Sequence, residues 1–328
     1  MKLSKVDDAR TPANLHRTLT LEMVRVTERA AIAAAEWRGK GDEMAADLAS
    51  VSAMKAELDT VGIAGRIVIG EGEQFECDDL FVGQPVGVGE GPAVDIAVDP
   101  LEGVTLCAKN QPDSLVVLAM AERGGLLNVA RNVYMHKLAI GAEYAAETVS
   151  IEWSATENVR ALAKAKGVPI SEITAIVLDR PRHAGLIEEL RTAGVAVKLL
   201  SDGDIAGVIH AVNTADTGVD IYLGSGGAPE GVLAAAALRC IGGHMQGKLI
   251  LDTPDKRAKA REMGITDLHR IYSVHELAAG DVLFSATGIT DGSLVEGVRL
   301  RRGSIETSTV VMRSWSQTTR WIKARHAR

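Results

Sequence analysis

The stretch Val94-Asp-Ile-Ala-Val-Asp99-Pro100-Leu-Glu-Gly103 decides how this chain folds. Its first six residues alternate with a period of two, which predicts a strand, and Pro100 is expected to end that strand. Asp99 and Glu102 follow where the strand stops, and Gly103 frees the backbone for close contact with a ligand. Two carboxylates at such spacing suit Mg²⁺ or Mn²⁺. The alternative is an ordinary β-turn with proline at its second position.

Helical patterns precede this stretch, and alternating patterns follow it. Apolar residues recur every three or four positions from Leu15, which predicts one helix to about Gly39 and a second from about Asp42 to Thr60. Downstream, we expect helices at 157–166, 184–193, 205–212 and 231–240, and strands at 115–121, 174–178, 195–200 and 219–223. Strand–helix alternation predicts an α/β fold with a mostly parallel sheet covered on both faces.

Length and composition set outer limits. With about 150 residues per domain, 328 residues predict two domains or one large α/β unit. We expect an N-terminal metal-binding α/β subdomain over 1–150 and a C-terminal α/β subdomain with substrate-binding loops over 151–328. Acidic residues outnumber basic ones by 43 to 36, and only 3% of residues are aromatic, which argues against a nucleic-acid partner. Three scattered cysteines and no long apolar run predict a cytoplasmic protein without a membrane partner.

Several further polar clusters lie near predicted strand or helix ends. Asp47 falls within about 40° of the apolar stripe of its helix, so it either pairs with an arginine or backbone donor or binds a metal. Gly70-Glu71-Gly-Glu73 follows a strand and is either a solvated turn or part of a site. Gly224 to Gly231 forms a glycine-rich strand-to-helix turn in which Glu230 either favours the helix dipole or faces a ligand.

Two loops in the second half carry paired charges. Arg180-Pro181-Arg182 contains two guanidinium groups that suit a phosphate, and Asp202-Gly203-Asp204 contains two carboxylates that suit sugar hydroxyls. Each loop is otherwise an ordinary polar connection, and His183 alone is expected to be structural. The chain carries no phosphate-binding loop, no nucleophile elbow and no zinc helix motif. Carboxylate–metal chemistry is therefore the most coherent prediction.

Taken together and in order, these motifs resemble one family. Asp-Pro-Leu-Glu-Gly at 99–103 is similar to the signature of the lithium-sensitive, metal-dependent phosphatases, which include inositol monophosphatase. The full set resembles class II fructose-1,6-bisphosphatase, over nearly the whole chain; it comprises 69–73, 99–103, 133–137, 180–183, 201–204, 226–231 and 286–290. The resemblance implies a layered α/β/α/β/α sandwich and hydrolysis of the 1-phosphate of fructose 1,6-bisphosphate, a step of gluconeogenesis. It also implies Mg²⁺ or Mn²⁺ and a homo-oligomer, a dimer or a tetramer.

The resemblance also assigns roles to individual residues. It implies that the catalytic metal ligands are five acids: Asp47, Glu71, Asp99, Glu102 and Glu230. It implies that the phosphorylated sugar contacts Glu102, Gly103, Val104, Tyr134, Arg180, Pro181, Arg182, Asp202, Gly203, Asp204 and Gly227. In this scheme the metals neutralise the phosphate and acidify the attacking water, while the arginines and Tyr134 position the sugar.

Two positions depart from the family pattern. Val104 stands where the family has a threonine that helps to orient the attacking water, and this replacement is either natural or introduced. Glu43-Met44 stands where other members have Lys-Asn. Thr105 is expected to point elsewhere and not to replace the missing hydroxyl. The alternatives left open are a sedoheptulose-1,7-bisphosphatase or dual-specificity enzyme, and a catalytically weakened homologue that binds phosphosugar as a regulator.

Overall fold

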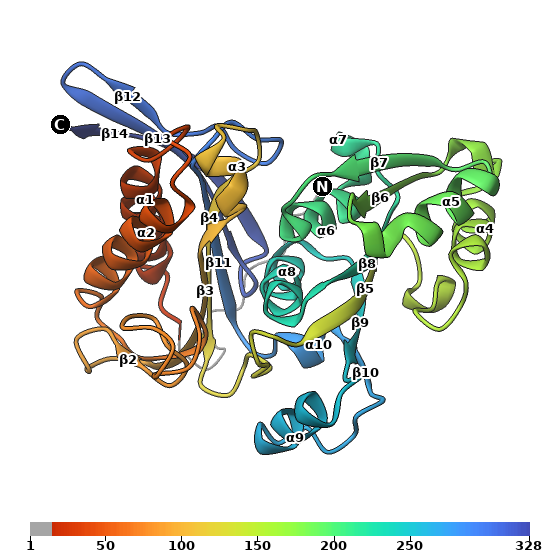
Figure 1. The fold of residues 1–328 in the computed structure, drawn as a ribbon, viewed down its shortest axis with the longest axis horizontal. Helices are drawn as coiled ribbons and strands as arrows, with labels where there is room; N and C mark the ends of the chain where they lie inside the picture. Colours follow the sequence, from red (N-terminus) through yellow and green to blue (C-terminus); the bar gives the residue numbers. More distant parts are fainter. Residues whose placement is uncertain (1–14) are drawn as a thin grey trace, which may run out of the picture.

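The computed structural model describes residues 15–328, which form five alternating layers of helices and sheets (Figure 1). Helices α1 (Leu19–Ala35) and α2 (Glu43–Leu58) make one outer layer. Helices α4 (Ala155–Lys166) and α5 (Ala184–Thr192) make the other. Between them lie two sheets with a helical layer sandwiched in the middle. The layered α/β/α/β/α sandwich implied by the resemblance is therefore confirmed.

The first sheet lies against α1 and α2. Its eight strands follow the order β12-β13-β11-β4-β3-β1-β2, with β14 paired to β13, and only β1 and β3 run parallel. The strands are β1 (Ala64–Ile69), β2 (Pro85–Val86), β3 (Ala93–Glu102), β4 (Leu115–Glu122), β11 (Val282–Gly288), β12 (Arg299–Arg301), β13 (Ser304–Arg313) and β14 (Thr318–Ala327). Strand β11, from the last part of the chain, thus pairs with β4 from the first half and brings β12 to β14 into this sheet.

Strand β4 shows how this sheet is held between two layers. Its residues from Leu115 to Ala121 are all buried. Val116, Leu118 and Met120 join the cluster that contains α1 and α2. Val117 and Ala119 join the opposite cluster, which contains the middle helices. Successive strand side chains point to opposite faces, so a strand covered on both faces must be apolar throughout.

The second sheet corrects the prediction of a mostly parallel sheet. Its order is β10-β9-β5-β8-β6-β7, and only the pairs of β6 with β7 and with β8 are parallel. Strand β5 lies antiparallel between β8 and β9, so β8 and β9 still point the same way. The helical crossovers keep their strands aligned, but β5 arrives from the first half of the chain and separates two of them. The strands are β5 (Tyr134–Ile140), β6 (Thr174–Leu178), β7 (Ala196–Leu200), β8 (Ile221–Gly227), β9 (His244–Ile250) and β10 (Ile271–Ser273).

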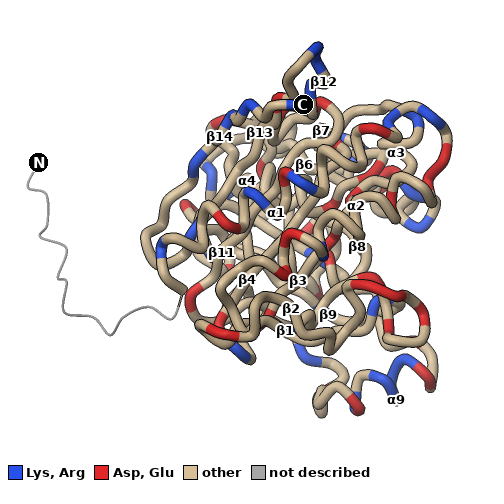
Figure 2. The backbone as a smooth tube through the Cα atoms, turned by 90° about the vertical axis from the view of Figure 1, so that its left-hand side faces the viewer, with Lys and Arg blue, Asp and Glu red and all other residues tan. Residues whose placement is uncertain are grey.

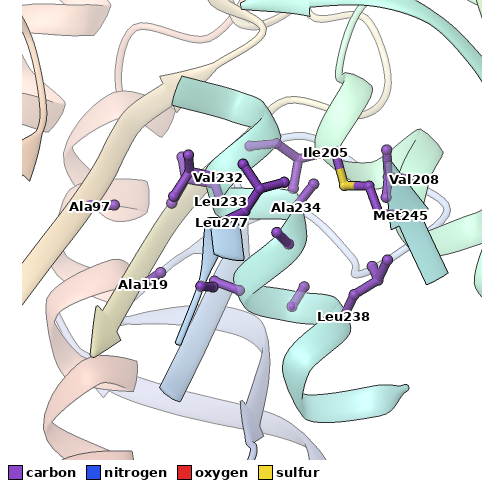
Figure 3. Close-up of a cluster of buried hydrophobic side chains, with 14 of the residues drawn as sticks. Ala97, Ala119, Ile205, Val208, Val232, Leu233, Ala234, Leu238, Met245 and Leu277 are labelled. Atoms are coloured by element: carbon purple, nitrogen blue, oxygen red, sulfur yellow. The ribbon is translucent and has the colours of Figure 1, made fainter. Parts of the chain in front are cut away.

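The middle layer consists of α6 (Asp204–Val212), α8 (Ala228–Ile241) and α10 (Val274–Leu277). Helix α8 is buried almost all round, and its run Ala234 to Ala237 is fully covered. Figure 3 shows α8 side chains between Ala97 and Ala119 of the first sheet and Met245 of the second. Small side chains let both sheets approach this helix closely. Glu230, in the first turn of α8, is thereby placed between the two sheets.

Shorter helices complete the described chain, and charge is spread over its surface. They are α3 (Val104–Ala108), α7 (Thr214–Thr217) and α9 (Pro254–Glu262), with 3₁₀ turns at Ala146–Thr148, Ile170–Glu172 and Pro181–His183. Basic residues along the β12–β14 region and on α9 are interspersed with acidic ones (Figure 2). Within residues 15–328, no helix combines the length and apolar character that a membrane span requires.

The division of the chain into two subdomains at residue 150 stays a prediction. The two sheets themselves exchange strands across that position. Strand β5, which precedes residue 150, lies in the second sheet, and β11 to β14, which follow it, lie in the first.

Candidate metal centre

A bulge in β3 brings Asp99 and Glu102 together. Asp99 pairs with Val117 of β4 and Glu102 pairs with Leu115. Between these two pairs β3 contains one residue more than β4, which is a β-bulge. Residues three apart on a regular strand point to opposite faces, and the extra residue turns them to the same side. The expectation that Pro100 ends the strand is wrong. Proline has no N–H to donate, and a bulge is a place where a strand tolerates that loss.

Glu230 reaches the same place from α8. One carboxylate oxygen from each of Asp99, Glu102 and Glu230 lies within 4.8 Å of the others. Gly227 makes this approach feasible, since a Cβ atom there would lie 1.9 Å from Glu230 Oε2. Glu230 Oε2 is buried and hydrogen bonds to none of residues 15–328. A buried acceptor without a donor is costly, and a cation relieves that cost.

Glu71 and Asp47 complete the set of five predicted acids. Glu71 follows β1 and lines a cavity of about 70 Å³ together with Asp99 and Glu230. Asp47 is half-buried on α2, and its pKa is raised by burial and by the charge of Asp99. Ser50, one turn further along α2, donates to the Pro100 carbonyl at 2.5 Å and ties the helix to the bulge. Asp47 and Asp99 lie close enough to Glu71 for the charges of their carboxylates to raise its pKa.

Burial and mutual repulsion raise the pKa of these acids. The pKa of Glu71 rises from its ordinary 4.5 to about 7, because of burial first and the charge of Asp47 next. Glu230 reaches a similar pKa of about 7, because of burial and the charge of Asp204. Burial, followed by the charge of Asp99, raises the pKa of Glu102 well above its usual range. Such a set of hard oxygen ligands fits a divalent metal, which would hold all of them ionised.

Two cations lie among these acids, and the sequence analysis assigned a role to neither. Arg131, in the connection between β4 and β5, lies 3.2 Å from the Glu71 carboxylate and lines the same cavity. Lys137 of β5 is fully buried and forms an ion pair with Asp204. A lysine inside the apolar strand Tyr134–Ile140 is the signal that marks Lys137. Arg131 has no comparable pattern around it.

The predicted substrate loops meet at the edge of the second sheet, beside the acids. Strands β6, β7 and β8 are parallel, so the loops that follow them share one edge. Arg180 and Asp202, from the first two loops, form an ion pair at 2.9 Å. Gly203 is left-handed at the start of α6, and Pro181 begins the 3₁₀ turn after β6.

Arg182 and Tyr134 form a stacked pair at this edge. The Arg182 guanidinium lies 5.2 Å from the centre of the Tyr134 ring. Its Nε and Nη2 atoms donate to the Ser225 carbonyl at 3.1 and 2.8 Å. Tyr134 pairs in register with Gly227, which links the stack to the Glu230 turn. His183 is buried with both ring nitrogens bonded, as expected for a structural residue.

The two departures from the family pattern lie next to each other. Gly103 is left-handed, with φ of 78°, and turns the chain from β3 into α3. Val104 then packs against the cluster under α1 and α2. Thr105 donates from Oγ1 to the Glu43 carboxylate at 2.8 Å, so its hydroxyl is engaged elsewhere, as expected. Met44 is 81% exposed.

The layered fold places an acid cluster that could hold a divalent metal between its two sheets. Comparison with known proteins then gives the family. Residues 17–326 match the family described as bacterial fructose-1,6-bisphosphatase, glpX-encoded, and the chain belongs to that family. A relative from Prochlorococcus marinus (strain MIT 9303) is 44% identical over 326 residues, covering 95% of this chain and 97% of the relative. One from Synechococcus elongatus is 44% identical over 337 residues, with the same coverage. Both are named D-fructose 1,6-bisphosphatase class 2/sedoheptulose 1,7-bisphosphatase.

Gly227→Ala should displace the Glu230 carboxylate while leaving the fold intact. The backbone at Gly227 has φ of −57°, which alanine adopts freely, and the added Cβ meets the Glu230 side chain. We expect Mn²⁺ affinity, measured by calorimetry, to fall by about 10-fold or more, as for lost support of a metal ligand. Gly185→Ala is the matched control, since its Cβ meets nothing within 4 Å. Equal Mn²⁺ affinity in both variants would contradict the role of Glu230.

The raised pKa values predict how pH affects the metal-free protein. Unfolded glutamates ionise near 4.5, whereas folded Glu71 and Glu230 ionise near 7, so ionisation between these values opposes folding. The double variant Glu71→Gln/Glu230→Gln should come closest to the wild type at pH 4 or below in EDTA, where both glutamates are protonated in both states. By pH 8 its free energy of unfolding should exceed that of the wild type by several kcal/mol, since a rise from 4.5 to about 7 corresponds to about 3 kcal/mol for each group. Urea unfolding at several pH values measures this difference, and a difference that does not change with pH would refute it.

Proposed function

We propose that this protein hydrolyses the 1-phosphate of fructose 1,6-bisphosphate to give fructose 6-phosphate and phosphate, with Mg²⁺ or Mn²⁺ as cofactor. One observation carries the proposal. Carboxylates of Asp99, Glu102 and Glu230 converge within 4.8 Å, and Glu230 Oε2 is buried without a partner among the described residues. The choice of substrate is supported by the names of the two relatives, both of which include D-fructose 1,6-bisphosphatase.

The proposed ligands of the metals are Asp47, Glu71, Asp99, Glu102 and Glu230. When bound there, a divalent metal supplies Lewis acidity toward the phosphate and a more acidic water. The chain's own contribution is to hold four of these acids on the rigid elements α2, β3 and α8 and to place Glu71 just after β1, so that their oxygens need little rearrangement. Burial within the sandwich keeps competing water away from them.

The proposed substrate contacts lie on the neighbouring loops. Arg180, Pro181 and Arg182 would face the distal phosphate, and the stacked Arg182–Tyr134 pair offers both a charge and a flat surface for the sugar. Asp202 and Gly203 lie one loop away. Asp204 is 5% exposed and ion-paired with Lys137, so we propose that it acts mainly by fixing the loop. Glu102, Gly103, Val104 and Gly227 would contact the phosphate nearest the metals.

A second substrate follows from the relatives' names. Both are named for sedoheptulose 1,7-bisphosphate as well as the fructose compound. The two sugars share the phosphorylated end that the metals would face, so we propose dual specificity. A kcat/KM comparison of the two bisphosphates decides between one substrate and two.

We further propose a cytoplasmic homo-oligomer, a dimer or a tetramer. The unpaired thiols of Cys77, Cys107 and Cys240 support a reducing compartment. Leu21 and Leu48, on the outer helical layer, are 54% and 63% exposed, which is consistent with contact between copies.

Asp99→Asn should remove most activity. The purified wild-type protein with Mn²⁺ should release phosphate from fructose 1,6-bisphosphate. Loss of one charged ligand from the cluster should lower kcat/KM by about 100-fold or more. Asp252→Asn, on the exposed surface, is a matched control with unchanged rate. Phosphate release at the same rate by the wild type and by Asp99→Asn would contradict the proposal.

Val104→Thr tests the missing hydroxyl. Val104 matches threonine in shape, and the family resemblance gives that threonine a role in orienting water. We expect kcat to rise by about 100-fold, the lower end of what one positioned proton-transfer group contributes. Thr105→Val is the control, because its hydroxyl already bonds to Glu43 and should leave kcat unchanged. An unchanged kcat in Val104→Thr would mean that the chain orients water by other groups.

One other function is favoured by a specific observation. The absence of a hydroxyl at Val104 fits a regulatory homologue that binds phosphosugar and turns it over slowly. The retention of all five acids argues against a pure binding protein. Binding of fructose 1,6-bisphosphate without measurable phosphate release, in both wild type and Val104→Thr, would favour the regulator.

A further inference from the structure

Arg131 occupies an unusual place between the acids and the surface. It lies at the turn before β5, where Val133 N donates to the Ala130 carbonyl at 3.0 Å. Ala130 and Val133 are both buried in the central cluster, so the backbone on either side of Arg131 is anchored. The Arg131 side chain is nevertheless 60% exposed. The guanidinium can therefore change position without a change in the backbone.

The Arg131 guanidinium lies where a metal bound by Glu71 would compete with it. It pairs with Glu71 at 3.2 Å, and it lines the cavity of about 70 Å³ that Asp99 and Glu230 also line. Its charge lowers the pKa of Glu71 and Asp47 against the effect of burial. A guanidinium and a metal ion cannot both occupy the same carboxylate oxygens of Glu71.

A second cavity offers Arg131 an alternative position. This cavity, of about 310 Å³, adjoins the first at Arg131 and is lined by Glu73, Glu76 and Lys259 among others. Glu73 and Glu76 lie in the same loop as Glu71, and neither is buried. They offer carboxylates to a guanidinium that leaves Glu71. An ion pair with one exposed partner is weak, so a divalent cation can displace it.

We propose that Arg131 is an exchangeable counter-ion, paired with Glu71 in the metal-free protein and displaced from it when a divalent metal binds. This role rests on the metal site of the proposed function. Arg131 is a positioning residue: it keeps the acid cluster neutralised before loading, and it sets how tightly the metal is held. The guanidinium moves toward Glu73 and Glu76 when Glu71 takes up the metal.

Calorimetric titration of the metal-free protein with Mn²⁺ at pH 8 tests this role. Arg131→Gln removes the competing charge, so Mn²⁺ should bind about 3- to 10-fold more tightly than to the wild type. Arg131→Lys keeps the charge and should stay within about 2-fold of the wild type. Arg123→Gln is the matched control. It removes an arginine of the same connection that pairs with Asp95 at 3.6 Å, and it should not change Mn²⁺ affinity.

Thermal unfolding supplies a readout that does not depend on activity. In EDTA, Arg131→Gln should melt below the wild type, because its acids lose their counter-ion. With saturating Mn²⁺ the two should melt together. Equal or weaker Mn²⁺ binding by Arg131→Gln overturns the inference and leaves the proposed function standing. Absence of Mn²⁺ binding to wild type and variant alike overturns the metal site itself, and the inference with it.

Discussion

Repulsion among buried carboxylates is the constraint on which this molecule depends. Asp99, Glu102 and Glu230 place oxygen atoms within 4.8 Å of one another, at a junction of two sheets and one helix. Burial alone disfavours each charge, and every neighbour adds to that cost. Even with Arg131 and Lys137 nearby, the pKa of Glu71 and of Glu230 rises to about 7. We propose that the fold tolerates this repulsion because the same oxygens would serve as ligands of a divalent metal.

The packing of the five layers holds these acids in place. The alanine-rich helix α8 lets two sheets close on it, which sets Glu230 beside β3. The bulge at Pro100 turns Glu102 to the side of Asp99, and Ser50 fastens α2 to that bulge. Gly227 leaves room for the Glu230 carboxylate. Each of these features is local, yet the proposed metal site requires all of them together.

The net charge of −7 is a poor guide to the ligand, because acidic residues are gathered at the candidate site. Taken over the whole chain, it argues against nucleic acid and equally against any phosphorylated partner. Five of the acids gather at one site, where bound divalent cations would create a local positive field for an anion. Lys137 and Arg131 already lie at that site, so the cluster is not uniformly negative. Net charge therefore describes solubility better than it describes a ligand.

Much of the fold follows from periodicity. The pattern from Leu15 predicted α1, and the second pattern predicted α2 to within a few residues of Glu43–Leu58. The prediction of a mostly parallel sheet was wrong, because β5 lies antiparallel between β8 and β9, and β11 pairs antiparallel with β4, which is distant in sequence. Local pattern shows that a strand exists, whereas its neighbour depends on packing across the whole chain.

The candidate site likewise contains residues that the sequence predicted and residues that it did not. The five acids were predicted from motifs and a family resemblance. In the structure Glu71, Asp99 and Glu230 line one cavity, Glu102 lies beside Asp99 and Glu230, and the charge of Asp99 raises the pKa of Asp47. The bulge at Pro100 was missed because proline usually ends a strand. Arg131 was missed because one arginine in a loop carries no local signal, and only the folded chain brings it to Glu71.

The most direct test of this account is an anomalous difference map from crystals grown with Mn²⁺. The account predicts metal density coordinated by Asp99, Glu102 and Glu230, at about 2.0–2.2 Å from their oxygens, with Glu71 and Asp47 beside it. Well-ordered carboxylates with no metal density among them, or Mn²⁺ bound only elsewhere on the protein, would contradict it.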